Sequence, residues 1–215
     1  IAQDADGAKV SFRHGQPRSF DLVVGADGLH SGVRALAFGE ESRFVRHLGA
    51  YVSSYSIPNH LDLDGWELLY SVPGKTAGMY PTRQGTTATA VFFFTSPPLA
   101  YDRHDPGQQK QLLARAFAGE AWEVPRMLEA MWEAPDFYFD TVSQVRMDRW
   151  SSGRVALVGD AAYGPSPMAG VGTSLALVGA YVLAGELAAA GGDHRTAFAS
   201  YERELRDYVG KGHKL

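Results

Sequence analysis

Strand signals open the hydrophobic pattern of this chain. Residues 8–12 alternate apolar and polar side chains, which predicts a half-buried strand, and a turn at residues 15–17 returns the chain as a second strand over residues 20–25. The apolar stretch FDLVVG in that second strand is typical of a strand covered on both faces. Asp6 and Gly7 form a turn dipeptide that leaves only residues 1–5 for a preceding strand. We therefore expect the chain to begin inside a hairpin and to be a fragment of a longer protein.

The middle of the chain carries a different pattern. Residues 26–39 predict a turn and a short helix for which Ser31 is a suitable N-cap. Strand and turn signals then alternate from about residue 44 to residue 100, which predicts an antiparallel or mixed sheet. The next segment is expected to form helices over residues 108–118 and 125–132 and a strand over residues 137–147.

Towards its end, the chain passes from a buried strand, residues 154–159, through an alanine-, glycine- and proline-rich loop into a long helix. That helix, residues 173–190, contains one charged residue, Glu186, and its length approaches that of a membrane span. Its glycines, its glutamate and the strand and loop before it favour packing on a sheet, so no stable membrane insertion is expected. A surface helix is predicted over residues 196–209, because apolar side chains recur there on one face.

The composition fits a globular protein of one large or two small domains. Of the 215 residues, 45% are hydrophobic and 20% are charged, and the net charge of −4 offers no basic field for nucleic acid. The sequence has no cysteine, which excludes disulfides and thiolate catalysis, and its seven histidines lack metal-ligand spacing. With no secretory signal visible, we expect a cytoplasmic protein that binds small molecules and no metal. The oligomeric state stays open.

The segment GRVALVGDAAYGPSPMAGVGTS, residues 153–174, carries the candidate chemistry. A parallel strand that ends at Asp160 brings a carboxylate to the sheet edge where open α/β folds bind ligands. Small residues then let the backbone approach a flat ligand, and residues 170–172 open the helix with free N–H groups at the positive end of its dipole. This pattern favours a ligand with a polyol arm and a planar ring whose edge becomes anionic. The alternative is that Asp160 only caps a helix.

Two segments resemble fingerprints of the group A FAD-dependent monooxygenases, the flavoprotein aromatic hydroxylases that include para-hydroxybenzoate hydroxylase and the tetracycline-inactivating monooxygenases. DLVVGADGLHSGVR, residues 21–34, is similar to the second fingerprint, and residues 153–172 are similar to the third. The resemblance implies an incomplete α/β flavoprotein hydroxylase fold with a mixed or antiparallel substrate-domain sheet. The implied parts are a partial FAD-binding domain at residues 1–43 and 147–190, a substrate domain at residues 44–146 and a C-terminal helix at residues 191–215.

The third fingerprint implies most of the cofactor contacts. Asp160, which follows Gly159, would bind a ribityl hydroxyl of FAD, Pro167 would lie beside the isoalloxazine, and Met168 would face the substrate. The residues that the resemblance places at the pyrimidine edge of the flavin are Gly170, Val171, Gly172, Thr173 and Ser174.

The second fingerprint implies a supporting role. Asp27 and Gly28 would support the ribityl and pyrophosphate region, and Arg34 would brace that loop or touch the pyridine nucleotide. Read alone, Asp27-Gly28 is an ordinary turn signal, and Arg34 is equally a solvated helix residue or an ion-pair partner.

The implied reaction places the chemistry on the cofactor. In this family NAD(P)H reduces FAD, O₂ adds to give a C4a-hydroperoxide, and one oxygen atom passes to an electron-rich ring, so no catalytic side chain is expected. The expected substrate is an aromatic or polyketide-like small molecule. Tyr51, Met79 and Phe93 are candidates for contacting it, although the sequence does not decide which face of the AVFFFT strand is turned to a ligand.

Several departures from the family pattern leave alternatives open. The first fingerprint, a glycine-rich turn for the ADP half of FAD, would lie before Ile1, so the fragment alone is expected to be inactive. Tyr163 stands for the usual histidine, Ser174 for a common asparagine, and Gly179-Ala180 for a common Asp-Ala pair. The alternatives are another flavin-dependent oxidoreductase, such as an epoxidase, halogenase or reductase, and a non-catalytic binding domain that keeps the fold.

Overall fold

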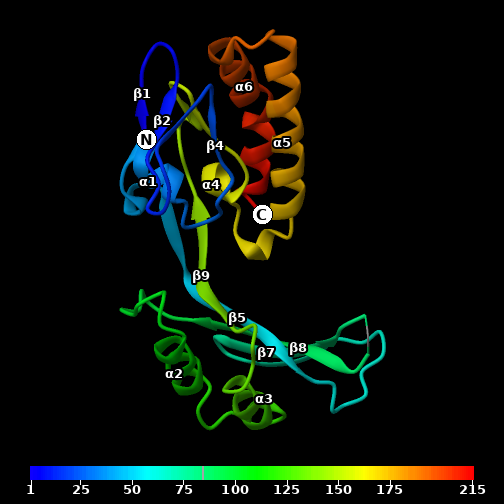
Figure 1. Cartoon of the computed structure of the whole chain (residues 1–215). Coiled ribbons are helices and arrows are strands. Elements are labelled where there is room, and N and C mark those ends of the chain that lie inside the picture. Colours follow the sequence, from blue (N-terminus) through cyan, green and yellow to red (C-terminus); the bar gives the residue numbers. More distant parts are fainter. Residues whose placement is uncertain (84) are drawn as a thin grey trace. The chain divides into compact units, whose positions relative to one another are not determined.

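The chain forms two compact units in a computed structural model that describes residues 1–83 and 85–215. The terminal unit contains residues 1–46 and 143–215, and the middle unit contains residues 47–142. Strands β5 (Val45–Pro58) and β9 (Tyr138–Val145) pass from one unit into the other (Figure 1). Helices and strands alternate with antiparallel and parallel pairings, which confirms the predicted α/β class.

The terminal unit begins with the predicted hairpin. Strands β1 (Ala2–Gln3), β2 (Ala8–Val10) and β3 (Arg18–Phe20) form an antiparallel sheet in that order. The prediction of one strand over residues 20–25 is wrong, because the chain leaves this sheet after β3. Strand β4 (Val23–Gly25) instead joins β11 (Val155–Leu157) in parallel, and the Val23 amide donates a 2.9 Å hydrogen bond to the Arg154 carbonyl.

Strand β11 is the buried centre of this second sheet, whose order is β10 (Ser151–Ser152), β11, β4. All three β11 residues are buried, as the sequence predicts. The prediction that FDLVVG is covered on both faces is wrong for the described residues, since Val24 is 46% exposed. The reason is that β4 lies at the edge of the sheet.

Helices cover the second sheet of the terminal unit. Helix α1 (Gly32–Phe38) has the predicted N-cap, because the Ser31 hydroxyl accepts a 2.9 Å hydrogen bond from the Arg34 amide. The long helices α5 (Gly172–Ala189) and α6 (His194–Gly212) lie side by side (Figure 1) and share a core with β11. Helix α5 is long and apolar enough to cross a membrane; it packs against α6, buries Leu175, Gly179 and Leu183, and leaves most of its other residues exposed. The short helices are η1 (Glu41–Arg43), α4 (Asp160–Tyr163) and η2 (Pro167–Ala169).

The middle unit is a five-stranded sheet with two helices on one face (Figure 1). Its strand order is β6 (Leu68–Val72), β7 (Lys75–Pro81), β8 (Thr87–Thr95), β5, β9. Helix α2 (Pro106–Ala116) starts earlier than predicted, because the Asp105 carboxylate caps it by accepting a 3.1 Å hydrogen bond from the Gln108 amide. Helix α3 (Val124–Met131) lies one residue before its expected position.

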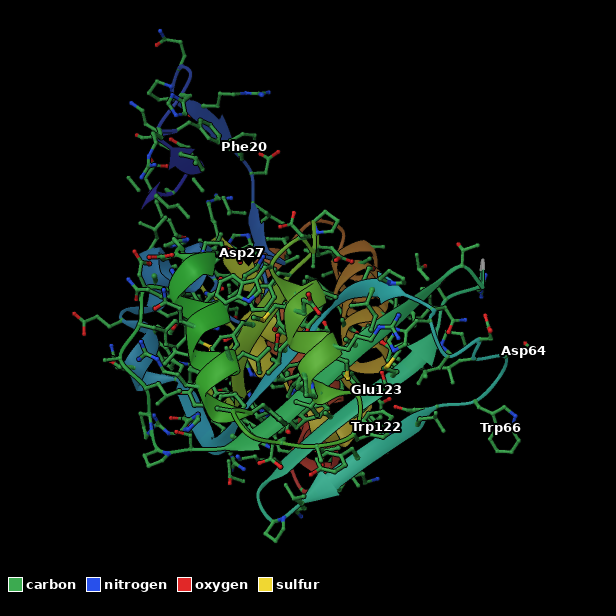
Figure 2. All side chains as sticks on the ribbon, turned by 90° about the horizontal axis from the view of Figure 1, so that it is seen from below. Phe20, Asp27, Asp64, Trp66, Trp122 and Glu123 are labelled. Carbon is green, nitrogen blue, oxygen red and sulfur yellow. The ribbon has the colours of Figure 1, made fainter. Side chains whose placement is uncertain are left out.

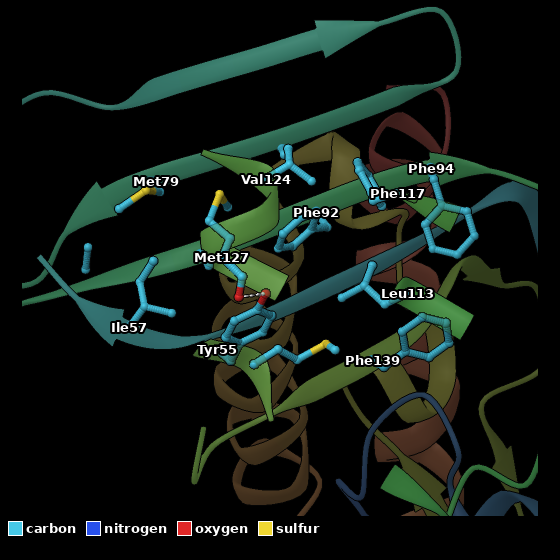
Figure 3. Packing of buried hydrophobic residues seen from close by; sticks show 14 of the residues in the cluster. Tyr55, Ile57, Met79, Phe92, Phe94, Leu113, Phe117, Val124, Met127 and Phe139 are labelled. Carbon is cyan, nitrogen blue, oxygen red and sulfur yellow. Dashed lines mark hydrogen bonds between the residues drawn. The ribbon is translucent and has the colours of Figure 1, made fainter. Parts of the chain in front are cut away.

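The side chains of β8 alternate between two environments. Phe92 and Phe94 are buried under the helices, where Phe92 makes an edge contact with Phe117 at 4.8 Å between ring centroids. The Tyr55 hydroxyl donates a 3.0 Å hydrogen bond to the Met127 carbonyl and so joins the sheet to α3 (Figure 3). Phe93 points to the opposite face and is only half-buried. This alternation supplies the orientation that the sequence left open.

Not every large apolar side chain of the middle unit joins this core. Trp66 is 74% exposed and projects from the loop before β6 (Figure 2).

The alternation predicts unequal costs for neighbouring substitutions. We expect Phe92→Ala to lower the free energy of unfolding by about 3–5 kcal/mol, because it opens a cavity between the sheet and its helices. Phe93→Ala, on the half-buried face of the same strand, is the matched control and should cost less than half as much. Urea denaturation followed by tryptophan fluorescence measures both values, and equal losses would contradict the assigned orientation.

Candidate functional site

Two loops meet at one edge of the β4–β11 pair. Because the strands are parallel, the chain leaves both at the same end, and the Val158 amide donates a 2.9 Å hydrogen bond to the Gly25 carbonyl. Figure 2 shows the chain running from Phe20 through β4 to Asp27. These loops and the start of α5 enclose a cleft of about 430 Å³. Its lining residues are Ala26, Gly28, Val158, Gly159, Asp160, Gly172, Thr173, Ala176, Leu177 and Ala180.

Among the lining residues, Asp160 is the one with a titratable side chain. It is the first residue of α4, and the positive φ of 64° at Gly159 turns the chain there. The cap position belongs to Gly159, and the Asp160 side chain makes no capping bond, so the capping alternative does not hold. Asp160 is exposed toward the cleft, yet the surrounding protein desolvates its carboxylate enough to raise its pKa. None of the described residues donates a hydrogen bond to this carboxylate.

The start of α5 lies close to the same carboxylate. A Cβ atom placed on Gly172 would stand 3.9 Å from the Asp160 Oδ1 atom. Val171 holds the N-cap position and supplies no side-chain acceptor to the first amides of the helix. Amides and the positive end of the helix dipole are therefore available to a ligand at this end of the cleft.

The Asp27 carboxylate is hydrogen-bonded within its own loop. Its Oδ1 atom accepts a 2.5 Å hydrogen bond from the Ser31 hydroxyl, and its Oδ2 atom accepts a 3.0 Å bond from the Val33 amide. Burial alone would raise the pKa of Asp27, but these hydrogen bonds outweigh burial and lower it. The Asp27 carboxylate thus fixes the loop that brings the Gly28 backbone to the cleft.

Arg34 joins the two loops from behind the cleft. Its side chain is fully buried, so the interpretation as a solvated helix residue is wrong. The guanidinium donates from Nη1 to the Ala161 carbonyl at 3.0 Å and from Nη2 to the Leu29 carbonyl at 2.5 Å. Arg34 Nη2 also forms an ion pair with Glu41 Oε2 at 3.5 Å. Arg34 therefore braces the loop after β4 against α4.

Comparison with known proteins shows the family of this chain. Residues 1–211 match the FAD-binding domain family. The chain belongs to that family. A flavin-dependent monooxygenase of Legionella longbeachae is 42% identical over 215 residues, which cover 100% of this chain and 55% of the relative. An uncharacterized protein of Mycobacterium tuberculosis is 47% identical over 209 residues, covering 97% of this chain and 56% of the relative.

Solved structures show the same relationship. The tetracycline destructase Tet(55) superimposes with a TM-score of 0.90 at 44% identity, covering 99% of this chain and 56% of that one. HpxO of Klebsiella pneumoniae, complexed with FAD and uric acid, gives a TM-score of 0.71 at 27% identity and covers 99% and 55%. The resemblance to group A FAD-dependent monooxygenases is thereby confirmed. The chain spans about half the length of the curated relatives it matches.

The cleft of this FAD-binding domain fits part of the cofactor. Its lining gives a polyol a carboxylate acceptor, Asp160, that lacks a donor among the described residues. At Gly28 and Gly172, no side chain stands between the backbone and the cleft. No side chain of the described residues fills the space between these groups. The donor set therefore suits a hydroxylated chain attached to an anionic or hydrogen-bonding ring.

Only some residues that the sequence singled out line this cleft. Gly28, Gly159, Asp160, Gly172 and Thr173 do. Asp27 and Arg34 lie behind the lining. The other predicted residues that do not line the cleft belong to the segment between α4 and the first turn of α5, and they are Pro167, Met168, Gly170, Val171 and Ser174. Met168 is 65% exposed.

The substrate candidates of the sheet are also separated. Tyr51 and Met79 are buried in the core of the middle unit, whereas Phe93 lies on the other face of its sheet.

Sequence reasoning missed the α5 wall of the cleft. Ala176 and Ala180 follow Gly172 at intervals of four residues, so the three lie on one helical face and line the cleft together. The signal was present as small residues at positions i, i+4 and i+8.

The raised pKa of Asp160 predicts a pH-dependent effect on stability. An acid whose pKa is raised by folding binds its proton more tightly in the folded state, so stability falls as pH rises through that pKa. We expect Asp160→Asn to raise the melting temperature of the FAD-free protein near pH 7. The gain should shrink as pH falls below the unfolded pKa and should be nearly gone below about pH 3, where the carboxyl group is mostly protonated in both states. Thermal unfolding across this range tests it, and a gain that is equal at both ends would contradict desolvation as its cause.

Proposed function

We propose that the complete protein is an FAD-dependent monooxygenase that uses NAD(P)H and O₂ to hydroxylate an aromatic or polyketide-like small molecule. The observation that carries the proposal is the Gly159-Asp160 turn, whose carboxylate receives no hydrogen bond from the residues that the structure describes and borders an open cleft beside the start of α5. The flavin-dependent monooxygenase of Legionella longbeachae and the destructase Tet(55) support it. Residues 1–43 and 147–190 would contribute to the FAD-binding domain and residues 44–146 to the substrate domain.

Different residues of the cleft would contact different parts of FAD. Asp160 would accept a hydrogen bond from a ribityl hydroxyl, and the first amides of α5, around Gly172 and Thr173, would face the pyrimidine edge of the flavin. Positive potential at that helix end favours negative charge on the ring. Asp27 and Arg34 would hold the Gly28 loop in position through the hydrogen bonds described above.

Bound FAD supplies the redox chemistry, that is, hydride acceptance and oxygen activation. The protein's part is to bind, orient and exclude water. This agrees with a lining in which Asp160 is the one titratable side chain among the described residues. Because an ionised carboxylate accepts a hydrogen bond more strongly than the neutral acid does, binding of the ribityl chain should lower the raised pKa of Asp160.

Two structural neighbours support the proposed substrate class. Tet(55) is a tetracycline destructase, and HpxO was solved with uric acid, a heteroaromatic ligand. We infer a planar, electron-rich ring system for this protein as well. Phe93 is the sheet candidate best suited to contact it, because Tyr51 and Met79 are enclosed under α2 and α3. A cytoplasmic location would suit a protein without cysteine that needs a reduced pyridine nucleotide.

The complete protein tests this proposal directly. It should purify with bound flavin and oxidise NADH or NADPH faster when a phenolic ring compound is added. Asp160→Ala should weaken FAD binding about ten- to a hundredfold, since a hydrogen bond to a charged group is worth roughly 1.5–3 kcal/mol. Flavin absorbance after gel filtration and titration of the apoprotein measure both effects.

Asp207→Ala, which removes an exposed carboxylate of α6, is the matched control and should bind FAD as the wild type does. A complete protein that is colourless and does not take up FAD would favour a non-catalytic binding domain. Bound flavin without ring-stimulated oxidation of the nicotinamide would favour another flavin-dependent oxidoreductase.

A further inference from the structure

Helix α4 connects the cleft to the core of the terminal unit in a single turn. Its first residue, Asp160, borders the cleft, and its last residue, Tyr163, is buried. The amides of Ala162 and Tyr163 both donate 3.0 Å hydrogen bonds to the Gly159 carbonyl. Because the turn is closed by these bonds, fixing the Tyr163 end also fixes the backbone of Asp160.

Tyr163 is held on three sides. Its ring contacts Trp150, with ring centroids 4.6 Å apart, and its carbonyl accepts a 3.1 Å hydrogen bond from His213 Nε2. Its hydroxyl lies 3.1 Å from the Tyr201 hydroxyl, which itself lies 2.8 Å from the Leu157 carbonyl. A carbonyl only accepts, so Tyr201 donates to Leu157 and Tyr163 donates to Tyr201. The chain of bonds ends on β11, the strand that delivers Asp160.

The Tyr163 hydroxyl fits against α5 only because residue 179 is glycine. A Cβ atom built on Gly179 would stand 1.8 Å from Tyr163 Oη and 3.0 Å from Cζ. Gly179 is buried in the middle of α5, the helix whose first turn borders the cleft. The hydroxyl therefore occupies the space that any side chain at position 179 would need.

We propose that Tyr163 and Gly179 form a matched pair that positions Asp160, and with it the start of α5, for FAD. The inference rests on the proposed role of the cleft in FAD binding. Neither residue lines the cleft, so both are positioning residues that act through α4 and α5. The two departures from the family pattern are therefore linked: tyrosine at position 163 fits only when residue 179 has no side chain.

The test uses FAD affinity of the complete apoprotein for three variants. Gly179→Ala should weaken FAD binding by about tenfold or more, because the new methyl group displaces the Tyr163 hydroxyl and tilts α4. Tyr163→Phe alone should weaken it by at most about fivefold, since only the hydrogen bond to Tyr201 is lost. The double variant should bind FAD within about threefold of Tyr163→Phe, because the 1.8 Å clash with Oη is removed and the ring has to shift by only a few tenths of an ångström to relieve the 3.0 Å contact at Cζ.

Two controls separate positioning from general stability. Gly185→Ala adds a methyl group to the same helix where nothing lies within 4 Å, and it should leave FAD binding unchanged. Leu183→Ala, in the same core, should lower the melting temperature of the apoprotein as much as Gly179→Ala does while retaining tighter FAD binding. The near-ultraviolet and visible circular dichroism of bound flavin should change for Gly179→Ala and return in the double variant.

The outcomes distinguish this inference from the function on which it rests. Wild-type apoprotein that takes up no FAD would overturn the proposed function itself. Wild-type binding together with a double variant as weak as Gly179→Ala would overturn the matched pair. If Gly179→Ala and Leu183→Ala lower the melting temperature equally and weaken FAD binding equally, the role of Tyr163 is core packing alone. If Gly179→Ala does not fold, recovery of a folded, FAD-binding double variant still supports the pair.

Discussion

The close parallel pairing of β4 with β11 is the constraint on which the site depends. It places Gly25 beside Leu157 and makes both strands end at one edge, so that residues far apart in the sequence share one cleft. Gly25 is required at this place, because a Cβ atom there would stand 2.6 Å from Leu157 Cδ2 and 2.8 Å from Val33 Cβ. Helix α1 and strand β11 can thus approach β4 at the same point, which brings Arg34 within reach of the α4 carbonyl that it braces.

The two aspartates at this edge have opposite electrostatic environments. This contrast distinguishes the carboxylate that stabilises its own loop from the one that we propose to bind a ligand. Desolvation acts on both carboxylates, but hydrogen bonds from Ser31 and Val33 lower the pKa of Asp27, whereas Asp160 receives none from residues 1–83 and 85–215 and its pKa is raised. A carboxylate whose acceptors are already used stabilises its own loop. One that is desolvated and unpaired gains most from a ligand that brings donors. The desolvated carboxylate therefore lies in the cleft that we propose for FAD.

Local patterns in the sequence were enough to predict most elements and the place of Asp160, because a buried strand followed by a glycine-rich loop has few alternatives. They did not show that β3 and β4 belong to different sheets, since both lie within one apolar stretch and only the partner strands β2 and β11 separate them. They also could not orient Tyr51, Met79 and Phe93, because alternation fixes which residues share a face but not which face the helices cover. The role of Asp27 required the positions of its hydrogen-bond donors.

The departures from the family pattern have different physical meanings once their neighbours are known. Ser174 lies outside the cleft lining, so its replacement of asparagine does not by itself alter the groups that face a ligand there. Tyr163 and Gly179 are complementary to within one atom, and the hydroxyl that needs the glycine also completes a hydrogen-bond chain to β11. A side chain at 179 would collide with the Tyr163 hydroxyl, so the glycine is needed for as long as residue 163 is tyrosine. The two departures are therefore one structural feature, the contact that packs α4 against α5.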